Sequence, residues 1–98
     1  MGRELPEAER VLAPYRAEID ALDAELVVLL ARRLDVVRRV IDIKRDEGLA
    51  ALLPERVEDV IDKVTAHALA HDVPKDLVEH LWRVLIAWVV AYEDARLR

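Results

Sequence analysis

The chain has 98 residues, a length that predicts a single domain over residues 1–98. It contains no Cys, Ser, Asn or Gln and one threonine, Thr65, which excludes disulfide frameworks and thiolate metal sites and leaves nucleophilic catalysis almost no residue to use. Two glycines cannot build a glycine-rich phosphate loop, and a net charge of −5 argues against nucleic acid as a partner.

Neither a membrane span nor a secretory signal is expected from the sequence. The longest apolar run, over residues 84–92, is shorter than the ~20 residues that cross a bilayer. Residues 1–6 lack the apolar core of a signal peptide. We therefore expect a soluble, cytoplasmic protein without a membrane partner.

Apolar residues recur at helical spacing along the chain, and no stretch alternates with a period of two. The spacing predicts a first helix over residues 14–46, with a kinked extension from about residue 6, because Pro14 suits a first helical position. Gly48 is expected to end this helix, within a loop over residues 47–53. A second helix over 54–70, a turn over 71–73 and a third helix from Pro74 to the C-terminus complete an all-α, three-helix chain.

The long first helix predicts a partner. Thirty-three residues span ~50 Å, whereas a compact domain of this length is only some ~35 Å across. One face carries an apolar stripe along the whole helix, made of Leu12, Tyr15, Ile19, Leu22, Leu26, Leu29, Leu30, Val36, Val37, Val40 and Ile43. Because one chain cannot cover this stripe, we predict an intertwined homodimer.

Three cations lie on or beside the apolar stripe. Arg33 and Lys44 face the same side of the helix within ~20° and are ~16 Å apart. Arg16 lies ~25 Å and ~100° away from Arg33, so only Arg16 of the partner subunit, in an antiparallel dimer, would reach the same place. The grouping predicts a pocket for a small dicarboxylate. The alternative is that each cation reaches water or forms an interhelical salt bridge.

Other polar and aromatic residues have structural explanations. His67 and His71 are one turn apart, a spacing that can bind zinc, but no third ligand is evident, so we expect a surface pair and no metal. Arg38 and Arg39 are expected on a solvated face, and Tyr92 in the core or a pocket wall.

The motifs of the first helix resemble those of the all-helical chorismate mutases. Arg16 is followed by Ile19-Asp20 and Asp23, then by Leu29-Leu30-Ala31-Arg32-Arg33, and Lys44 lies eleven residues after Arg33. The resemblance covers about residues 11–95. It implies an intertwined dimer that converts chorismate to prephenate by a pericyclic Claisen rearrangement, in the shikimate pathway to aromatic amino acids or in secondary metabolism, with no cofactor and no covalent intermediate.

The resemblance also implies roles for individual residues. Arg16 of the partner subunit and Arg33 would bind the two substrate carboxylates. Lys44 would bind one carboxylate and the ether oxygen, which gains negative charge as the C–O bond breaks. Glu93 would donate a hydrogen bond to the ether oxygen, which requires a protonated carboxyl group. Catalysis is thus assigned to Arg33, Lys44 and Glu93.

Further substrate-binding positions leave the identity of the substrate open. Arg56 matches a pocket arginine of the family, and Val57 and Val89 would also contact substrate. Val57, however, stands where many chorismate mutases have a Glu that binds the ring hydroxyl. Pro54-Glu55-Arg56-Val57 is similar to isochorismate pyruvate lyases, and Glu93-Asp94 to aminodeoxychorismate mutases. Chorismate mutase is the predicted activity, those two enzymes are its alternatives, and a non-catalytic helical dimerisation module is the alternative of another class.

Overall fold

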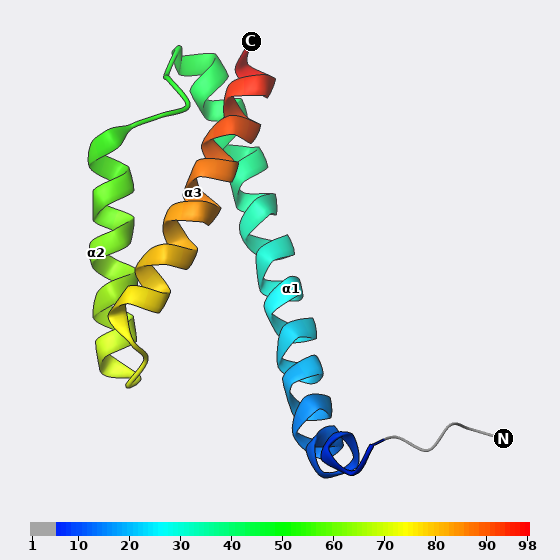
Figure 1. The fold of residues 1–98 in the computed structure, drawn as a ribbon. Coiled ribbons are helices and arrows are strands. Elements are labelled where there is room, and N and C mark those ends of the chain that lie inside the picture. The colour runs from blue at the N-terminus through cyan, green and yellow to red at the C-terminus, as the bar shows by residue number, and fades with distance from the viewer. Residues whose placement is uncertain (1–5) are drawn as a thin grey trace, which may run out of the picture. The chain divides into compact units, whose positions relative to one another are not determined.

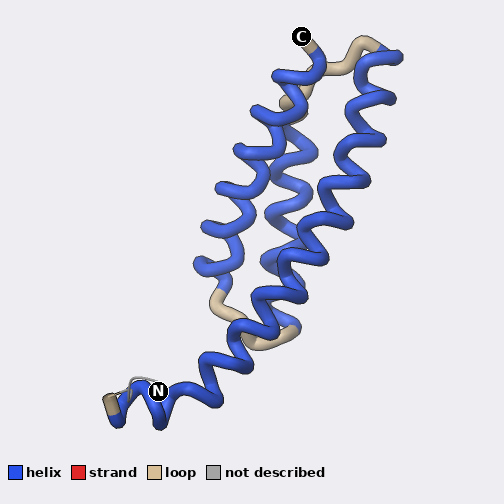
Figure 2. Tube along the Cα trace, turned by 90° about the vertical axis from the view of Figure 1, so that its right-hand side faces the viewer, coloured by secondary structure: helices blue, strands red, loops and turns tan. Residues whose placement is uncertain are grey.

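The structure is a computed structural model that describes residues 6–98, and these form three helices without any strand (Figures 1 and 2). The helices are α1 (Glu7–Glu47), α2 (Pro54–Ala70) and α3 (Lys75–Leu97). The predicted all-α, three-helix chain is confirmed. Residues 1–5 lie outside the described residues. The expectation about a secretory signal depends on them. The chain divides into two compact units, one ending at Asp35 and one over Val36–Arg98.

The kinked extension that the sequence predicts from about residue 6 is part of the first helix. Because α1 starts at Glu7, Pro14 lies in its interior rather than at its first position. Glu7 and Glu9 in the first turn favour this start, because carboxylates stabilise the positive end of the helix dipole. Pro14 has no N–H to donate to the carbonyl of Arg10, a defect that bends helices. The dark blue first turns of α1 accordingly run in a different direction from the turns that follow (Figure 1).

Gly48 ends α1 as predicted. Its φ of 67° lies in the left-handed region, where a side chain is disfavoured. The N–H of Leu49 donates to the carbonyl of Lys44 at 2.8 Å, and the N–H of Gly48 donates to that of Arg45 at 3.3 Å. These two bonds satisfy carbonyls that a helix end otherwise leaves unpaired. The chain thereby turns into the segment over residues 49–53, which leads to α2.

Helices α2 and α3 form a hairpin in which they lie side by side (Figure 1). The turn over residues 71–73 is found as predicted, and α3 begins one residue after Pro74. Ile61 and Ala68 of α2 and Ile86 of α3 are buried. Arg83 of α3 donates two hydrogen bonds to the carboxylate of Glu58 on α2, at 3.0 and 3.1 Å, which fixes one helix against the other.

The apolar stripe of α1 is uncovered within one chain. Every one of its members up to residue 30 is exposed, as are Val36, Val40 and Ile43. Within residues 6–98, no side chain is completely buried. None of the helices in this part of the chain combines the length and apolar character needed to cross a membrane.

Candidate active site

A buried ion pair joins the end of α1 to α3 in the unit over Val36–Arg98. The Nζ atom of Lys44 lies 3.0 Å from Oε2 of Glu93. The same ammonium donates a second hydrogen bond, of 2.9 Å, to the carbonyl oxygen of Ala51. Only 9% of Lys44 and 5% of Glu93 is exposed. Charges that are removed from water to this extent need a partner, and here each group compensates the other.

The local fold explains how these three groups meet. Lys44 lies in the last turn of α1, where a cation is favoured by the negative end of the helix dipole. The turn at Gly48 redirects the chain, so that the buried Ala51 returns its carbonyl to Lys44. Glu93 follows the apolar run of α3 and therefore lies on a helix already held against α2. The end of α1, the segment over residues 49–53 and α3 thus each contribute one group to this cluster.

A second cluster, in which two arginines contact an aromatic residue, lies on the same two helices. Nε of Arg38 donates a 3.1 Å hydrogen bond to the hydroxyl of Tyr92. The guanidinium of Arg96 lies 3.4 Å from the centre of the Tyr92 ring, and Trp88 stacks on this ring with centroids 5.1 Å apart. The hydrogen bond from Arg38 lowers the pKa of Tyr92, because it favours the phenolate. Arg38 is exposed, as expected for a solvated face, and its hydrogen bond to Tyr92 also links α1 to α3.

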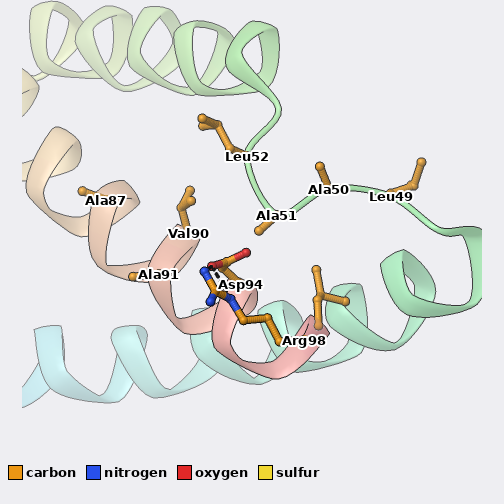
Figure 3. Close-up of a pocket in the computed structure, with 10 residues that line it drawn as sticks. Leu49, Ala50, Ala51, Leu52, Ala87, Val90, Ala91, Asp94 and Arg98 are labelled. Carbon is orange, nitrogen blue, oxygen red and sulfur yellow. Dashed lines mark hydrogen bonds and ion pairs between the residues drawn. The ribbon is translucent and has the colours of Figure 1, made fainter.

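An open hollow lies between the segment after α1 and the end of α3 (Figure 3). It has a volume of about 460 Å³. Asp94 and Arg98, paired at 2.8 Å, line it together with apolar side chains from both segments. Neither Lys44 nor Glu93 is among the lining residues, but Ala51, whose carbonyl accepts a hydrogen bond from Lys44, is one of them.

The remaining residues of the predicted site are more open to solvent. Arg56 is exposed and pairs with Asp59 on its own helix. Val57 and Val89 are half-buried. In the unit that ends at Asp35, Arg33 is half-buried, and Arg16 is exposed and pairs with Glu9. Of the predicted catalytic residues, the structure therefore brings Lys44 and Glu93 into direct contact within one unit.

Metal ligation has no support in the described part of the chain. Across residues 6–98, no three His, Cys, Asp or Glu side chains gather in a way that could hold a metal ion. His67 and His71 are both exposed, as expected for a surface pair.

Comparison with known proteins places these observations in a family. The sequence model described as chorismate mutase type II matches residues 15–94. The 4-amino-4-deoxychorismate mutase of Streptomyces venezuelae is 33% identical over 83 residues, which are 85% of this chain and 81% of that protein. The isochorismate pyruvate lyase of Pseudomonas aeruginosa is 33% identical over 86 residues, or 88% of this chain and 84% of the lyase.

The chorismate mutase of Methanocaldococcus jannaschii is 28% identical over 75 residues, 76% of either chain. Three other relatives are longer, and the chain spans 19% to 24% of their length. No solved structure gives a significant match. Because the family match includes both Arg16 and Glu93 and covers most of the sequence, this chain belongs to the type II chorismate mutase family.

Proposed function

We propose that this chain is an isomerase that rearranges chorismate to prephenate in a pocket shared between two copies. The observation that carries the proposal is the buried Lys44 ammonium, held at 3.0 Å from Glu93 in a chain of this family. A pericyclic rearrangement needs no nucleophile, which agrees with a sequence free of Ser and Cys. It needs a compact substrate conformer and positive charge near the breaking C–O bond.

The proposed site assigns one task to each cation. Arg33 and Arg16 of the partner subunit bind the two substrate carboxylates, since guanidinium groups bind carboxylates in a bidentate manner. Lys44 stabilises the negative charge that develops on the ether oxygen, and its burial strengthens this interaction. Arg56 is the fourth cation of the proposed pocket.

Apolar contacts and one carboxyl group complete the proposed pocket. Val57 and Val89 contact the substrate ring, and their partial burial is compatible with a pocket wall. Glu93 lies close enough to Lys44 to act at the same ether oxygen.

The exposed apolar stripe of α1 supports the proposal that a second copy of the chain binds there. Leu22 and Leu26 each leave 57% of their surface exposed, and Ile43 leaves 59% exposed. A soluble monomer seldom exposes a continuous apolar patch along the length of a helix. A second copy would cover this surface and bring its own Arg16 to the pocket. The proposed protein is thus one helical domain, over residues 1–98, in an intertwined homodimer.

A second candidate substrate is aminodeoxychorismate. Glu93 forms a salt bridge with the Lys44 ammonium, at 3.0 Å. A carboxyl group that already pairs with one ammonium is suited to bind an ammonium substituent on the substrate. The similarity to a protein named 4-amino-4-deoxychorismate mutase also favours this candidate.

Parallel assays of the purified protein with chorismate, aminodeoxychorismate and isochorismate test the proposal. We expect conversion of chorismate to prephenate, and a loss in kcat/KM on the order of 100- to 1000-fold in Lys44→Ala, because a buried electrostatic contact to the transition state is removed. Lys63→Ala is the matched control, since Lys63 is exposed and pairs with Asp59. Turnover of aminodeoxychorismate alone would identify the second candidate. If the protein converts none of the three compounds, the proposed enzymatic function is contradicted.

A further inference from the structure

Lys44 contacts the segment that follows α1 at two points. Its backbone carbonyl accepts a 2.8 Å hydrogen bond from the N–H of Leu49, and its Nζ atom donates a 2.9 Å hydrogen bond to the carbonyl oxygen of Ala51. Gly48, with a φ of 67°, turns the chain between Lys44 and these two residues. The end of α1 and the segment after it are therefore joined so that a backbone carbonyl lies against the buried ammonium.

The carbonyl of Ala51 and the carboxylate of Glu93 together determine where the Lys44 ammonium points. An ammonium group has three N–H donors. One of them donates to Ala51 and another to Glu93, at 2.9 and 3.0 Å. We propose that Ala51 is a positioning residue, whose carbonyl fixes the direction of the Lys44 ammonium so that a single N–H remains for the substrate. This inference rests on the proposed function, in which Lys44 acts at the ether oxygen.

The second acceptor is important because a lysine side chain is flexible. Its ammonium is a compact charge at the end of a four-carbon stem, with three donors that rotate together. With Glu93 as the one acceptor, the ammonium would rotate about that contact, and its other two donors would sweep through many directions. A second acceptor, on a different segment, stops this rotation. The third N–H is then oriented before charge develops on the substrate, which is the arrangement that lowers a barrier most effectively.

The acceptor that the segment after α1 supplies carries no charge. Residues 49–53 are leucines and alanines, so the polar groups of this segment are those of its backbone. A second carboxylate here would add a negative charge beside the ammonium and oppose the approach of an anionic substrate. The carbonyl of Ala51 accepts the hydrogen bond without that repulsion. Ala51 and Lys44 are both buried, which strengthens the bond between them.

Replacement of one backbone amide by an ester tests this role, because an ester carbonyl is a weaker hydrogen-bond acceptor. The chain is synthesised with an ester between Ala51 and Leu52, which weakens the carbonyl of Ala51. The matched control has the ester between Ala50 and Ala51, one carbonyl earlier. With the first ester, kcat for chorismate should fall on the order of tenfold and KM should change less than about twofold, because the lost interaction acts mainly in the transition state. The control should behave as the unmodified chain does.

A measurement without substrate tests the contact itself. Lys44 is labelled with nitrogen-15 at Nζ, and NMR measures how fast its ammonium protons exchange with water. The exchange should be slower than that of Lys63, labelled in the same way, because the side chain of Lys63 is 64% exposed. It should become several-fold faster with the ester after Ala51 and remain unchanged with the control ester.

Four outcomes would contradict these expectations. Exchange at Lys44 as fast as at Lys63 in the unmodified chain would overturn the inference, even if neither ester variant folds. An equal loss of kcat with both esters would assign the effect to the fold of the segment, and faster exchange with unchanged kcat would mean that the contact does not position Lys44 for the reaction; either overturns the inference while the proposed function stands. Absence of turnover in the unmodified chain refutes the proposed function, whereas the exchange rates still report whether Ala51 holds Lys44.

Discussion

Tyr92 joins two helices through one hydroxyl group and one aromatic ring. Its hydroxyl accepts a hydrogen bond from Arg38 on α1, while its ring contacts Trp88 and Arg96 on its own helix. Glu93 is the next residue in the chain. The Arg38–Tyr92 contact therefore helps to fix the part of α3 that presents Glu93 to Lys44.

The ionisation of Tyr92 provides a test of this contact. The hydrogen bond from Arg38 lowers the pKa of the phenol from the ordinary value of 10.0. Arg38→Gln should therefore shift the appearance of tyrosinate absorbance to higher pH. The measurement is made in a Tyr15→Phe background, so that Tyr92 is the one tyrosine observed. An unchanged titration midpoint would mean that the hydrogen bond is absent in solution.

The sequence identified the members of the buried pair but not their contact. Lys44 was singled out by its helical register with Arg33, and Glu93 by the family resemblance. Their pairing was not predictable, because 49 residues separate them and no local rule determines which turn of α3 meets the end of α1. The role of Ala51 was missed for a different reason. It acts through its backbone carbonyl, which carries no signal in the amino-acid sequence.

Both turns between helices use a residue in the left-handed region. Gly48 has a φ of 67° after α1, and Asp72 has a φ of 56° after α2. In each turn, an N–H just past the helix donates back to a carbonyl five residues earlier, from Leu49 to Lys44 and from Val73 to Ala68. The same left-handed backbone conformation is thus adopted by Gly48 in one turn and by Asp72 in the other, and Asp is less suited to it than Gly.

Substitutions at these two turns should change stability in opposite directions. Gly48→Ala should lower the free energy of unfolding by about 1 kcal/mol, because a Cβ is strained at this φ although no atom stands in its way. Asp72→Gly should raise it, by up to about 1 kcal/mol, by relieving the same strain. Thermal unfolding at a fixed protein concentration measures both, with about 4–8 °C expected per kcal/mol. Shifts of the same sign would contradict this explanation.

Helix boundaries were predictable where glycine or proline acts on its own neighbours. Gly48 and Pro54 mark the end of α1 and the start of α2 at their predicted places. The sequence predicted the extension from about residue 6 but placed Pro14 at a first helical position, because proline is compatible both with that position and with a bent helix interior. The acidic first turn at Glu7 and Glu9 favours one continuous helix.

At the scale of the whole molecule, the prediction with the most consequences is the second copy. The sequence predicted a second copy because the first helix is longer than a compact domain of 98 residues, so that one chain cannot cover its apolar face. The structure adds that this apolar stripe is uncovered and that residues 6–98 contain no completely buried side chain. One chain divides into two compact units, one ending at Asp35 and one over Val36–Arg98. The prediction of a single domain therefore depends on the proposed dimer.

A pair of charge substitutions on α1 tests the dimer and the shared site together. Leu26 lies on the apolar stripe, whereas Val28 lies ~200° away around the helix. The two side chains are equally exposed in one chain, at 57% and 59%. If a second copy covers the stripe, Leu26→Lys buries an unpaired charge in each protomer, which should weaken dimerisation on the order of 100-fold or more. Val28→Lys should leave dimerisation unchanged.

Sedimentation equilibrium should give twice the 11.2 kDa chain mass for the unmodified chain and for Val28→Lys, and a smaller average mass for Leu26→Lys at the same micromolar concentration. Activity should follow the dimer, because each pocket needs Arg16 of the partner subunit. Raising the concentration of Leu26→Lys should therefore restore mass and specific activity in parallel. A folded monomer that retained full activity would show that Arg33 and Lys44 act without a second chain, and the shared pocket would have to be abandoned. Equal dissociation of both variants would instead mean that charge on α1, rather than coverage of the apolar stripe, controls assembly.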